Sequence, residues 1–436
     1  MTPTYPNSYC LVLSGGGAKG IYHIGAWRAL RELDVPVNAF IGNSIGAIIS
    51  AFLAQGLFTE LEEIADTIGI EAVMNLPDEL VEEGRLQIDR TRMAAVRRFS
   101  KTILERRAID TSPTRNLVYD KIDEDKIRAS GVDLAVVTFN ISDMKPREVF
   151  IENMEQGQLK EYILASAAFP GFDRPVIEGK RHIDGGVYNN LPYNLAVSRG
   201  YKRIIVVDVS GIGVNRRINT RGTNTVYIKN SIDIGGVLNF DRETLNQLKT
   251  LGYLDTMKAF GRVVGNRYFI DLNEAWEQKF GLFLARKFGP RYRDRIIELK
   301  VLPPSLRHER YLFYPLLDST ASALRLDRIK RYAYPELCEA IVRVKSQIDR
   351  NIDALAGDEE RRRFMRTARR VRRGRRTRGD LARSPYYYSR LLRRSDTPPP
   401  RSMTDRTLRA FFPELSGAEF LLPELEEFMR EMGQPN

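Results

Sequence analysis

The sequence predicts an α/β sandwich of three layers with a mainly parallel central sheet, followed by a mostly helical C-terminal portion. Apolar runs at 9–13 and 37–41 each lead into a glycine-rich turn and then into a helix-like run, at 21–33 and 45–57. Strands that alternate with helices in this way form a parallel sheet with helices packed on its faces. From about residue 276 the chain reads as helices.

The pattern of residues along the chain indicates four parts. We expect a first domain over 8–275, in which 59–128 forms a helical excursion or lid, because its apolar residues have helical spacing. A helical extension over 276–356 follows, then an arginine-rich segment with a proline linker over 357–401, and short helices over 402–436. A chain of 436 residues is long enough to bury a core in more than one unit.

The composition is that of a globular protein without covalent cross-links. Hydrophobic residues make up 43% of the chain, and no apolar run reaches the ~18 residues of a membrane-spanning helix. The first residues lack the basic start of a signal peptide. Cys10 and Cys338 have no partner ligands nearby, so neither a disulfide framework nor a cysteine-based zinc site is expected. We therefore expect a metal-free cytoplasmic protein, although a protein secreted without a leader would have the same features.

The positive charge is concentrated in one segment. The formal net charge is +12, and residues 361–378 hold eleven arginines and no acid, so the rest of the chain carries +1. Phe364, Ala368 and Val371 have helical spacing there, which predicts a basic amphipathic helix. We expect the segment from Arg361 to Arg378 to favour an anionic membrane surface. Nucleic acid is an unlikely partner because no recognised binding module accompanies the arginines, and a solvated linker is the third alternative.

The first glycine-rich turn, at 14–20, reads Ser-Gly-Gly-Gly-Ala-Lys-Gly. Consecutive glycines at Gly15, Gly16 and Gly17 let backbone N–H groups converge on an anion without an obstructing Cβ, so we expect an oxyanion hole. Together with Gly20 the turn also satisfies a dinucleotide-binding pattern. That interpretation requires an acidic residue at the end of the next strand, and none stands there.

The second turn carries a serine between two glycines, Gly42-x-Ser44-x-Gly46. This is the pattern of a nucleophile elbow, in which the serine lies on a tight turn between a strand and a helix. Ser44 would then lie at the N-terminus of the following helix, where the helix dipole favours developing negative charge.

A serine nucleophile needs a base. His308 is the histidine that the order of a Ser-Asp-His triad would require, and its surroundings predict a surface histidine. Asp184 ends a strand-like run and is followed by Gly185 and Gly186, so its carboxylate could approach another turn closely. A free aspartate with a pKa of ~3.9 is a weak base, so burial or a proton shared with the serine must assist. His182 would share a strand face with Asp184 and is expected to be structural or a neighbour of the acid.

Three of these motifs together resemble a known family. The residues at 14–20, Gly-Asn-Ser-Ile-Gly at 42–46 and Asp-Gly-Gly at 184–186 are similar, in order and spacing, to the signature motifs of the patatin-like phospholipases. The segment at 165–172 resembles a further block of that family. The resemblance covers roughly residues 8–260.

The resemblance implies a lipid acyl hydrolase that works through a Ser–Asp dyad. Ser44 would be the nucleophile and Asp184 the base, with the amides of Gly15, Gly16 and Gly17 as the oxyanion hole. The substrate would be a phospholipid or another acyl lipid, cleaved through an acyl-enzyme, and no cofactor or metal is implied. The remaining motif residues would support the site, and they are Lys19, Gly20, Gly42, Gly46, Gly185 and Gly186.

Several alternatives remain open at this point. Lys19 would either contact a lipid phosphate or pack its stem on the first helix with a solvated ammonium. The chain could instead be an α/β-hydrolase for soluble esters, with a Ser-His-Asp triad that uses His308. It could also be a non-catalytic scaffold that docks on membranes or nucleic acid through its arginines, in which case Ser44 would not react with a fluorophosphonate.

Overall fold

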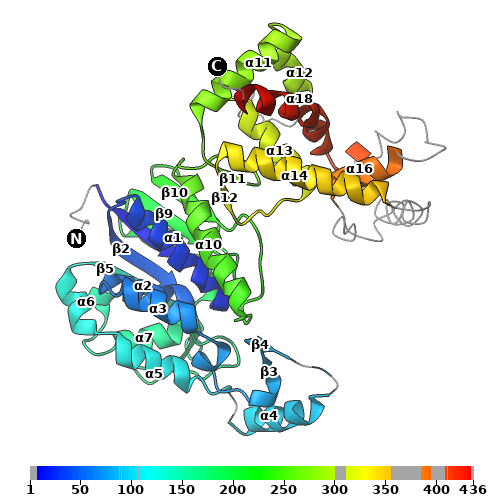
Figure 1. Ribbon diagram of the computed structural model, residues 1–436. Coiled ribbons are helices and arrows are strands. Elements are labelled where there is room, and N and C mark those ends of the chain that lie inside the picture. The colour runs from blue at the N-terminus through cyan, green and yellow to red at the C-terminus, as the bar shows by residue number, and fades with distance from the viewer. Residues whose placement is uncertain are drawn as a thin grey trace. The chain divides into compact units, whose positions relative to one another are not determined.

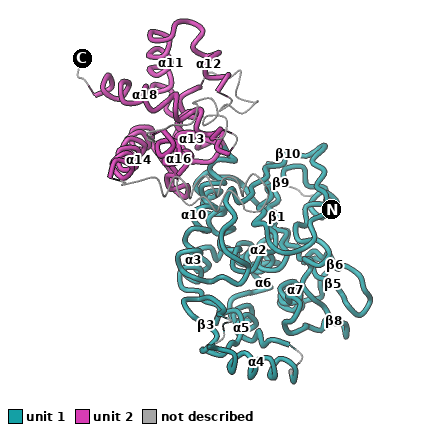
Figure 2. Tube along the Cα trace, turned by 90° about the vertical axis from the view of Figure 1, so that its right-hand side faces the viewer, with its two compact units in different colours: residues 1–260 teal, residues 261–436 magenta. Residues whose placement is uncertain are grey.

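The computed structural model describes the chain in two compact units, 1–260 and 261–436 (Figure 2). The described residues are 7–87, 89, 91–106, 108–299, 311–354, 384–393, 408–409 and 411–433. The predicted arginine-rich helix at 361–378 and His308 lie outside them, so the proposed membrane contact of these arginines stays a prediction. Both cysteines are buried and carry free thiols. No helix in the described part of the chain is long and apolar enough to cross a bilayer.

Unit 1 is built on a central sheet with the strand order β10-β9-β1-β2-β5-β8-β7, and β6 pairs with β5 (Figure 1). From β10 to β5 neighbouring strands are parallel, whereas β6, β7 and β8 run antiparallel to their neighbours. The predicted mainly parallel sheet is therefore confirmed. The strands are β1 (Tyr9–Leu13), β2 (Val37–Asn43), β5 (Asp133–Asn140), β6 (Lys145–Phe150), β7 (Val176–Ile177), β8 (Lys180–Asp184), β9 (Arg203–Asp208) and β10 (Asn224–Lys229).

Helices cover both faces of this sheet, which confirms the three layers. On one face α2 packs on β2 and β5, α7 packs on β5, and α1 places Trp27 edge-on against Phe40 of β2. On the other face Val12, Ile41 and Val206 form a core with Tyr193 of α9. The helices named here are α1 (Ile21–Glu32), α2 (Ile45–Ala54), α7 (Leu159–Ser166), α9 (Tyr193–Ser198) and α10 (Arg242–Ala259), which packs along α1.

The excursion at 59–128 contains helices and one small hairpin. Strands β3 (Val81–Glu82) and β4 (Arg85–Leu86) form the hairpin. The helices are α3 (Phe58–Thr67), α4 (Met93–Arg106), α5 (Ser112–Lys121) and α6 (Glu124–Ser130), with 3-10 turns η2 (Ile70–Ala72) and η3 (Asp78–Leu80). Other short turns of unit 1 are η1 (Gly17–Gly20), η4 (Ile151–Asn153) and α8 (Gly186–Asn189).

Strand β5 is where segments distant in the sequence meet. β6 pairs along the C-terminal part of β5 on one edge, so β2 and β8 must share the other edge. On that edge Asn43, the last residue of β2, lies opposite Val137, and Asp184, the last residue of β8, lies opposite Thr138. The two strand ends therefore abut, which brings Ser44 next to Asp184.

Unit 2 is helical, as predicted for the C-terminal portion. Its core is rich in aromatic rings, with Phe280 stacked on Phe313 at 4.1 Å between centroids and both rings close to Phe428. Its elements are β11 (Phe269–Ile270), α11 (Glu274–Phe288), α12 (Tyr292–Glu298), α13 (Phe313–Leu324), β12 (Arg331–Tyr332), α14 (Tyr334–Asp353), α16 (Pro385–Arg393) and α18 (Leu415–Gly433).

Two boundaries of unit 2 differ from those expected from the sequence. The division falls after Phe260 rather than near residue 275, because the carboxylate of Asp318 accepts the backbone N–H groups of residues 266–268 and ties that segment to unit 2. Residues 408–409 and 411 are helical, and α18, with 19 residues, is longer than the short helices expected over 402–436. Its buried apolar face continues past Pro423.

Candidate active site

Ser44 occupies a strained turn between β2 and α2. Its φ of 55° and ψ of −128° lie in a region that residues with a side chain rarely adopt, which is typical of functional sites. The Ser44 N–H donates to Ser166 Oγ at 2.9 Å and holds the turn in place. A Cβ at Gly42 would collide with the backbone of Gly46, and a Cβ at Gly46 would collide with the carbonyl oxygen of Leu13. Both glycines are therefore needed for the turn to pack.

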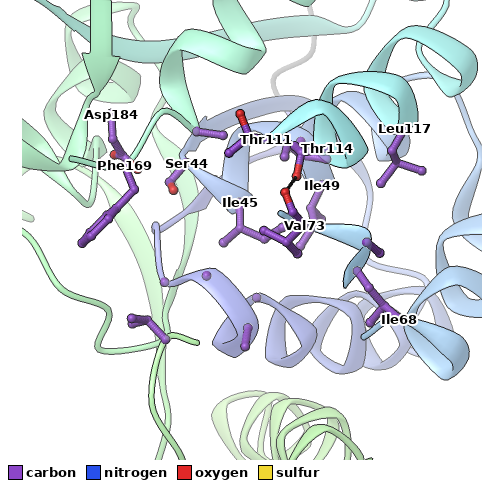
Figure 3. A pocket seen from close by; sticks show the side chains of 18 of the residues that line it. Ser44, Ile45, Ile49, Ile68, Val73, Thr111, Thr114, Leu117, Phe169 and Asp184 are labelled. Carbon is purple, nitrogen blue, oxygen red and sulfur yellow. Dashed lines mark hydrogen bonds between the residues drawn. The ribbon is translucent and has the colours of Figure 1, made fainter. Parts of the chain in front are cut away.

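Asp184 lies at the end of β8 and points at the serine (Figure 3). Its Oδ1 accepts the Gly186 N–H at 2.7 Å and Asn43 Nδ2 at 3.2 Å, and the carboxylate lies next to the Ser44 side chain. The residue is 5% exposed. Burial raises the pKa of Asp184 above its ordinary value, while Ser44 and the hydrogen bonds from Gly186 and Asn43 oppose that rise. The carboxylate is therefore a stronger base than an aspartate in water.

An asparagine pair that the sequence analysis missed joins the three motifs. Asn43 Nδ2 donates both to Asp184 and, at 3.1 Å, to Asn190 Oδ1. Asn190 in turn donates from Nδ2 to the Gly15 carbonyl at 3.3 Å, and its own carbonyl accepts the Gly15 N–H at 3.2 Å. Asn43 belongs to the serine motif itself, and the buried polar pair Asn189-Asn190 shortly after Asp-Gly-Gly was the available signal for the second residue.

The glycine loop has fewer amides available than its sequence suggests. The Gly15 N–H is already bonded to Asn190, so Gly15 does not fit the predicted role of an oxyanion donor. A Cβ at this position would collide with Asn190 Oδ1, which explains the need for glycine in packing terms. Among the described residues the amides of Gly16 and Gly17 have no acceptor, and both glycines line the cavity that contains Ser44. Gly17 has a φ of 56°, which favours glycine.

Lys19 matches neither of the alternatives considered for it. The residue is buried, and its Nζ lies 2.5 Å from Asp233 Oδ1 in the loop after β10. The ammonium is thus ion-paired rather than solvated or presented to a ligand. The pair ties the glycine loop to the loop that follows β10.

Neither described histidine belongs to the cavity of Ser44. His23 is fully buried, and burial lowers its pKa to about 4, so the ring is neutral at pH 7 and donates from Nε2 to the Ser14 carbonyl at 2.9 Å. His182 has its Nδ1 3.0 Å from the Lys180 carbonyl, and burial lowers its pKa as well. Both are structural, which is one of the two roles expected for His182. Within the described part of the chain no group of three or more potential metal ligands lies together.

Ser44 and Asp184 open into an apolar cavity of about 1490 Å³, including the open space at its mouth. Its far wall comes from the excursion, where α3 contributes Leu61, the residue after α3 is Ile68, and α5 contributes Leu117 (Figure 3). Thr111 and Thr114 lie between this wall and the serine, and the ionisable lining residues are Arg115, Asp173 and Asp184. The segment interpreted as a helical excursion or lid therefore forms part of the cavity wall.

The fold and this site place unit 1 in the class of α/β proteins that carry a serine on a strand-to-helix turn above a mainly parallel sheet. Residues 11–197 match the family model described as patatin-like phospholipase, and this part of the chain belongs to that family.

Curated relatives share the domain at moderate identity. The chain is 29% identical over 207 residues to patatin-like phospholipase domain-containing protein 6 of Mus musculus, covering 47% of this chain and 14% of that protein. It is 28% identical over 205 residues to lysophospholipase NTE1 of Mycosarcoma maydis, covering 46% of this chain and 10% of that protein. The match thus spans a small part of these much longer proteins.

Similar solved structures include VipD from Legionella pneumophila, at 12% identity and a TM-score of 0.29, covering 95% of this chain and 92% of that one. Another is ExoU in complex with SpcU from Pseudomonas aeruginosa, at 15% identity and a TM-score of 0.29, covering 93% and 91%.

Proposed function

We propose that unit 1 is a phospholipase A-type acyl hydrolase that cleaves fatty-acyl esters of lipids through an acyl-enzyme. One observation carries the proposal: the Ser44 side chain and the Asp184 carboxylate lie next to each other at one end of an apolar cavity. A fatty-acyl chain in that cavity would bring its ester carbonyl to the serine. Membership of residues 11–197 in the patatin-like phospholipase family supports the same reaction class.

The proposed chemistry uses each group once in each half-reaction. Ser44 Oγ attacks the ester carbonyl carbon while its proton passes to Asp184, and the negative charge on the carbonyl oxygen accepts hydrogen bonds from the amides of Gly16 and Gly17. Collapse of the tetrahedral intermediate expels the alcohol, which takes the proton from Asp184. Water then attacks the acyl-enzyme and gives a proton to Asp184, and as the bond to Ser44 Oγ breaks, Asp184 returns the proton to Ser44 Oγ and the fatty acid leaves.

Asp184 suits this role without a histidine. Burial favours its protonated form, so a proton taken from Ser44 is retained better than by an aspartate in water. Asn43 and Gly186 donate to Oδ1 and hold the carboxyl group in one orientation. The Ser44 hydroxyl therefore faces a base whose position is fixed before substrate binds.

The cavity also supports a choice of first substrate. Its lining is mostly apolar and includes Ile45, Ile49 and Leu117, which fits a fatty-acyl chain better than a polar acyl group. One relative is named a lysophospholipase, so we propose single-chain lysophospholipids, followed by two-chain phospholipids, as the esters to assay.

The test compares hydrolysis of lysophosphatidylcholine by the full chain and by single variants. We expect Ser44→Ala and Asp184→Asn each to lower turnover by about 10³-fold or more. Ser50→Ala is a matched control. Ser50 is buried on α2, the helix that begins directly after Ser44; its Oγ has no hydrogen-bond partner, and the residue does not line the cavity. His308→Ala should change turnover little.

Three outcomes would contradict the proposal. An active Asp184→Asn variant combined with an inactive His308→Ala variant would indicate a Ser-His-Asp triad. An unlabelled Ser44 after treatment with a fluorophosphonate would indicate a non-catalytic scaffold. Equal activity of Ser44→Ala and the parent on every ester would exclude Ser44 as the nucleophile.

A further inference from the structure

Large apolar side chains remain exposed around the opening of the Ser44 cavity. Phe169, Ile212 and Leu238 line the cavity and are also exposed, Ile212 to 65%. They come from three separate loops, which follow α7, β9 and β10. Single exposed apolar residues are ordinary on a protein surface, whereas several around one opening indicate an interaction surface.

The exposed apolar surface continues onto α8. Val214, which is 51% exposed, donates its N–H to the Gly186 carbonyl at 2.8 Å, and its own carbonyl accepts the Asn190 N–H at 2.8 Å. These bonds hold the loop after β9 against α8, which carries the exposed Val187. We call this surface the mouth patch, and it consists of Phe169, Val187, Ile212, Val214 and Leu238.

Positive charge accompanies the mouth patch. Residues 210–217, which follow the C-terminal end of β9, contain the exposed Arg216 and Arg217 and no acidic residue. The guanidinium of Arg216 lies 3.9 Å from the centroid of the Tyr188 ring on α8, which places this charge beside Val187.

The acids that line or adjoin the cavity lie outside the loop after β9. Asp173 lines the cavity and accepts the Thr111 N–H at 3.3 Å, and Asp233 is neutralised by Lys19. The loop after β9 therefore combines apolar side chains with a local excess of arginine.

We propose that the mouth patch, together with Arg216 and Arg217, docks unit 1 on an anionic phospholipid bilayer. The apolar side chains enter the boundary between head groups and acyl chains, and the arginines contact lipid phosphates. Charge complementarity selects an anionic surface, and exposed apolar residues favour a lipid surface over nucleic acid, on which they would stay in water. The docking rests on the proposed function for its purpose, since it sets the cavity opening against the membrane, where a lipid could enter without crossing water.

Binding to vesicles tests this docking without catalysis. The full chain carrying Ser44→Ala is sedimented with phosphatidylcholine vesicles that contain about 30% phosphatidylserine, and with phosphatidylcholine vesicles alone. We expect preference for the anionic vesicles, and about 10-fold weaker binding after either Val214→Asp or Arg217→Glu. Retained melting temperatures confirm that these variants fold.

Two control variants match these changes elsewhere on the protein. Leu282→Asp alters a leucine of α11 that is 67% exposed. Lys126→Glu reverses an exposed charge on α6, which leads into the N-terminal end of β5, whereas residues 210–217 follow the C-terminal end of β9. Both should bind anionic vesicles as the parent does.

The proposed docking surface would be wrong if Val214→Asp and Arg217→Glu bind anionic vesicles as tightly as the parent does. It would also be wrong if the two control variants lose as much vesicle binding as these two variants. Loss in Arg217→Glu alone would also overturn it, because apolar insertion would then be absent. Binding that depends on residues 361–394 and on neither loop variant would assign the membrane contact to the arginine segment instead. Because Ser44→Ala is the parent here, failure to hydrolyse lipid would refute the proposed function and leave this result standing.

Discussion

Removing the hydrogen bond between the Asn43 and Asp184 side chains tests whether Asp184 is the base. Asn43 is fully buried, and its Nδ2 donates to Asp184 Oδ1 at 3.2 Å. Replacing Asn43 by alanine removes one of the hydrogen bonds that favour the ionised carboxylate. A hydrogen bond to a charged group contributes about 1.5–3 kcal/mol, so the ionised form of Asp184 loses about that much relative to the protonated form.

The sign of the effect on activity follows from this loss. The proposed first step requires ionised Asp184, so activity falls as the pH drops through its pKa. Asn43→Ala raises that pKa further, and the acid limb of the kcat/KM profile should move to higher pH. The assay is hydrolysis of a soluble short-chain ester across the acid range, with vesicles absent so that membrane binding does not contribute.

Asn140→Ala is the matched control for this experiment. Asn140 is also buried, and its Nδ2 donates to Asp143 Oδ2 at the same distance of 3.2 Å, away from the cavity. Its acid limb should coincide with that of the parent. An unmoved limb in Asn43→Ala, or an equal displacement in both variants, would refute Asp184 as the base.

Three further predictions concern the loop, the cavity and the stability of the fold. Gly15→Ala should abolish hydrolysis and lower the free energy of unfolding by about 1–3 kcal/mol, because its Cβ would collide with Asn190; a denaturant titration with parental stability would contradict this. Ala65→Phe fills the cavity wall, so turnover of long-chain esters should fall at least about 10-fold relative to butyrate esters, and an unchanged ratio would show that acyl chains bind elsewhere. Asp184→Asn should raise the melting temperature at neutral pH. The pKa of Asp184 is higher in the folded protein than in the unfolded chain, so the parent protein loses stability as the pH rises through the folded-state pKa of this residue. If the increase in melting temperature does not become smaller as the pH is lowered, the prediction is wrong.

The local sequence pattern was sufficient to predict the strands and helices that flank the site. β1 begins and ends where the apolar run predicts, and α1 begins at Ile21 as expected, because strands, glycine turns and helices in this region each have a short-range signal. The mainly parallel sheet and the helical C-terminal portion follow from the same signals. The serine and the aspartate were identifiable because each stands in a motif with glycines.

Other features depend on contacts between distant residues and could not be predicted from pattern. The partner of Lys19 lies 214 positions further along the chain, so its ion pair had no local signal. The engagement of the Gly15 amide likewise depends on where Asn190 folds back. The 59–128 segment has ordinary helical spacing, and its role as a cavity wall emerges only when α3 and α5 pack beside the serine.

The edge of β5 that β2 and β8 share fixes the positions of Ser44 and Asp184, whereas other parts of the chain line the cavity. The distance between Ser44 and Asp184, the proposed nucleophile and base, is set by two neighbouring residues of one strand, Val137 and Thr138, rather than by the long stretch of chain between them. Much of that stretch forms the walls that an acyl chain would touch. Insertions and deletions there can reshape which lipids fit while the reacting atoms keep their spacing, whereas a one-residue bulge in β5 would part them without altering either side chain.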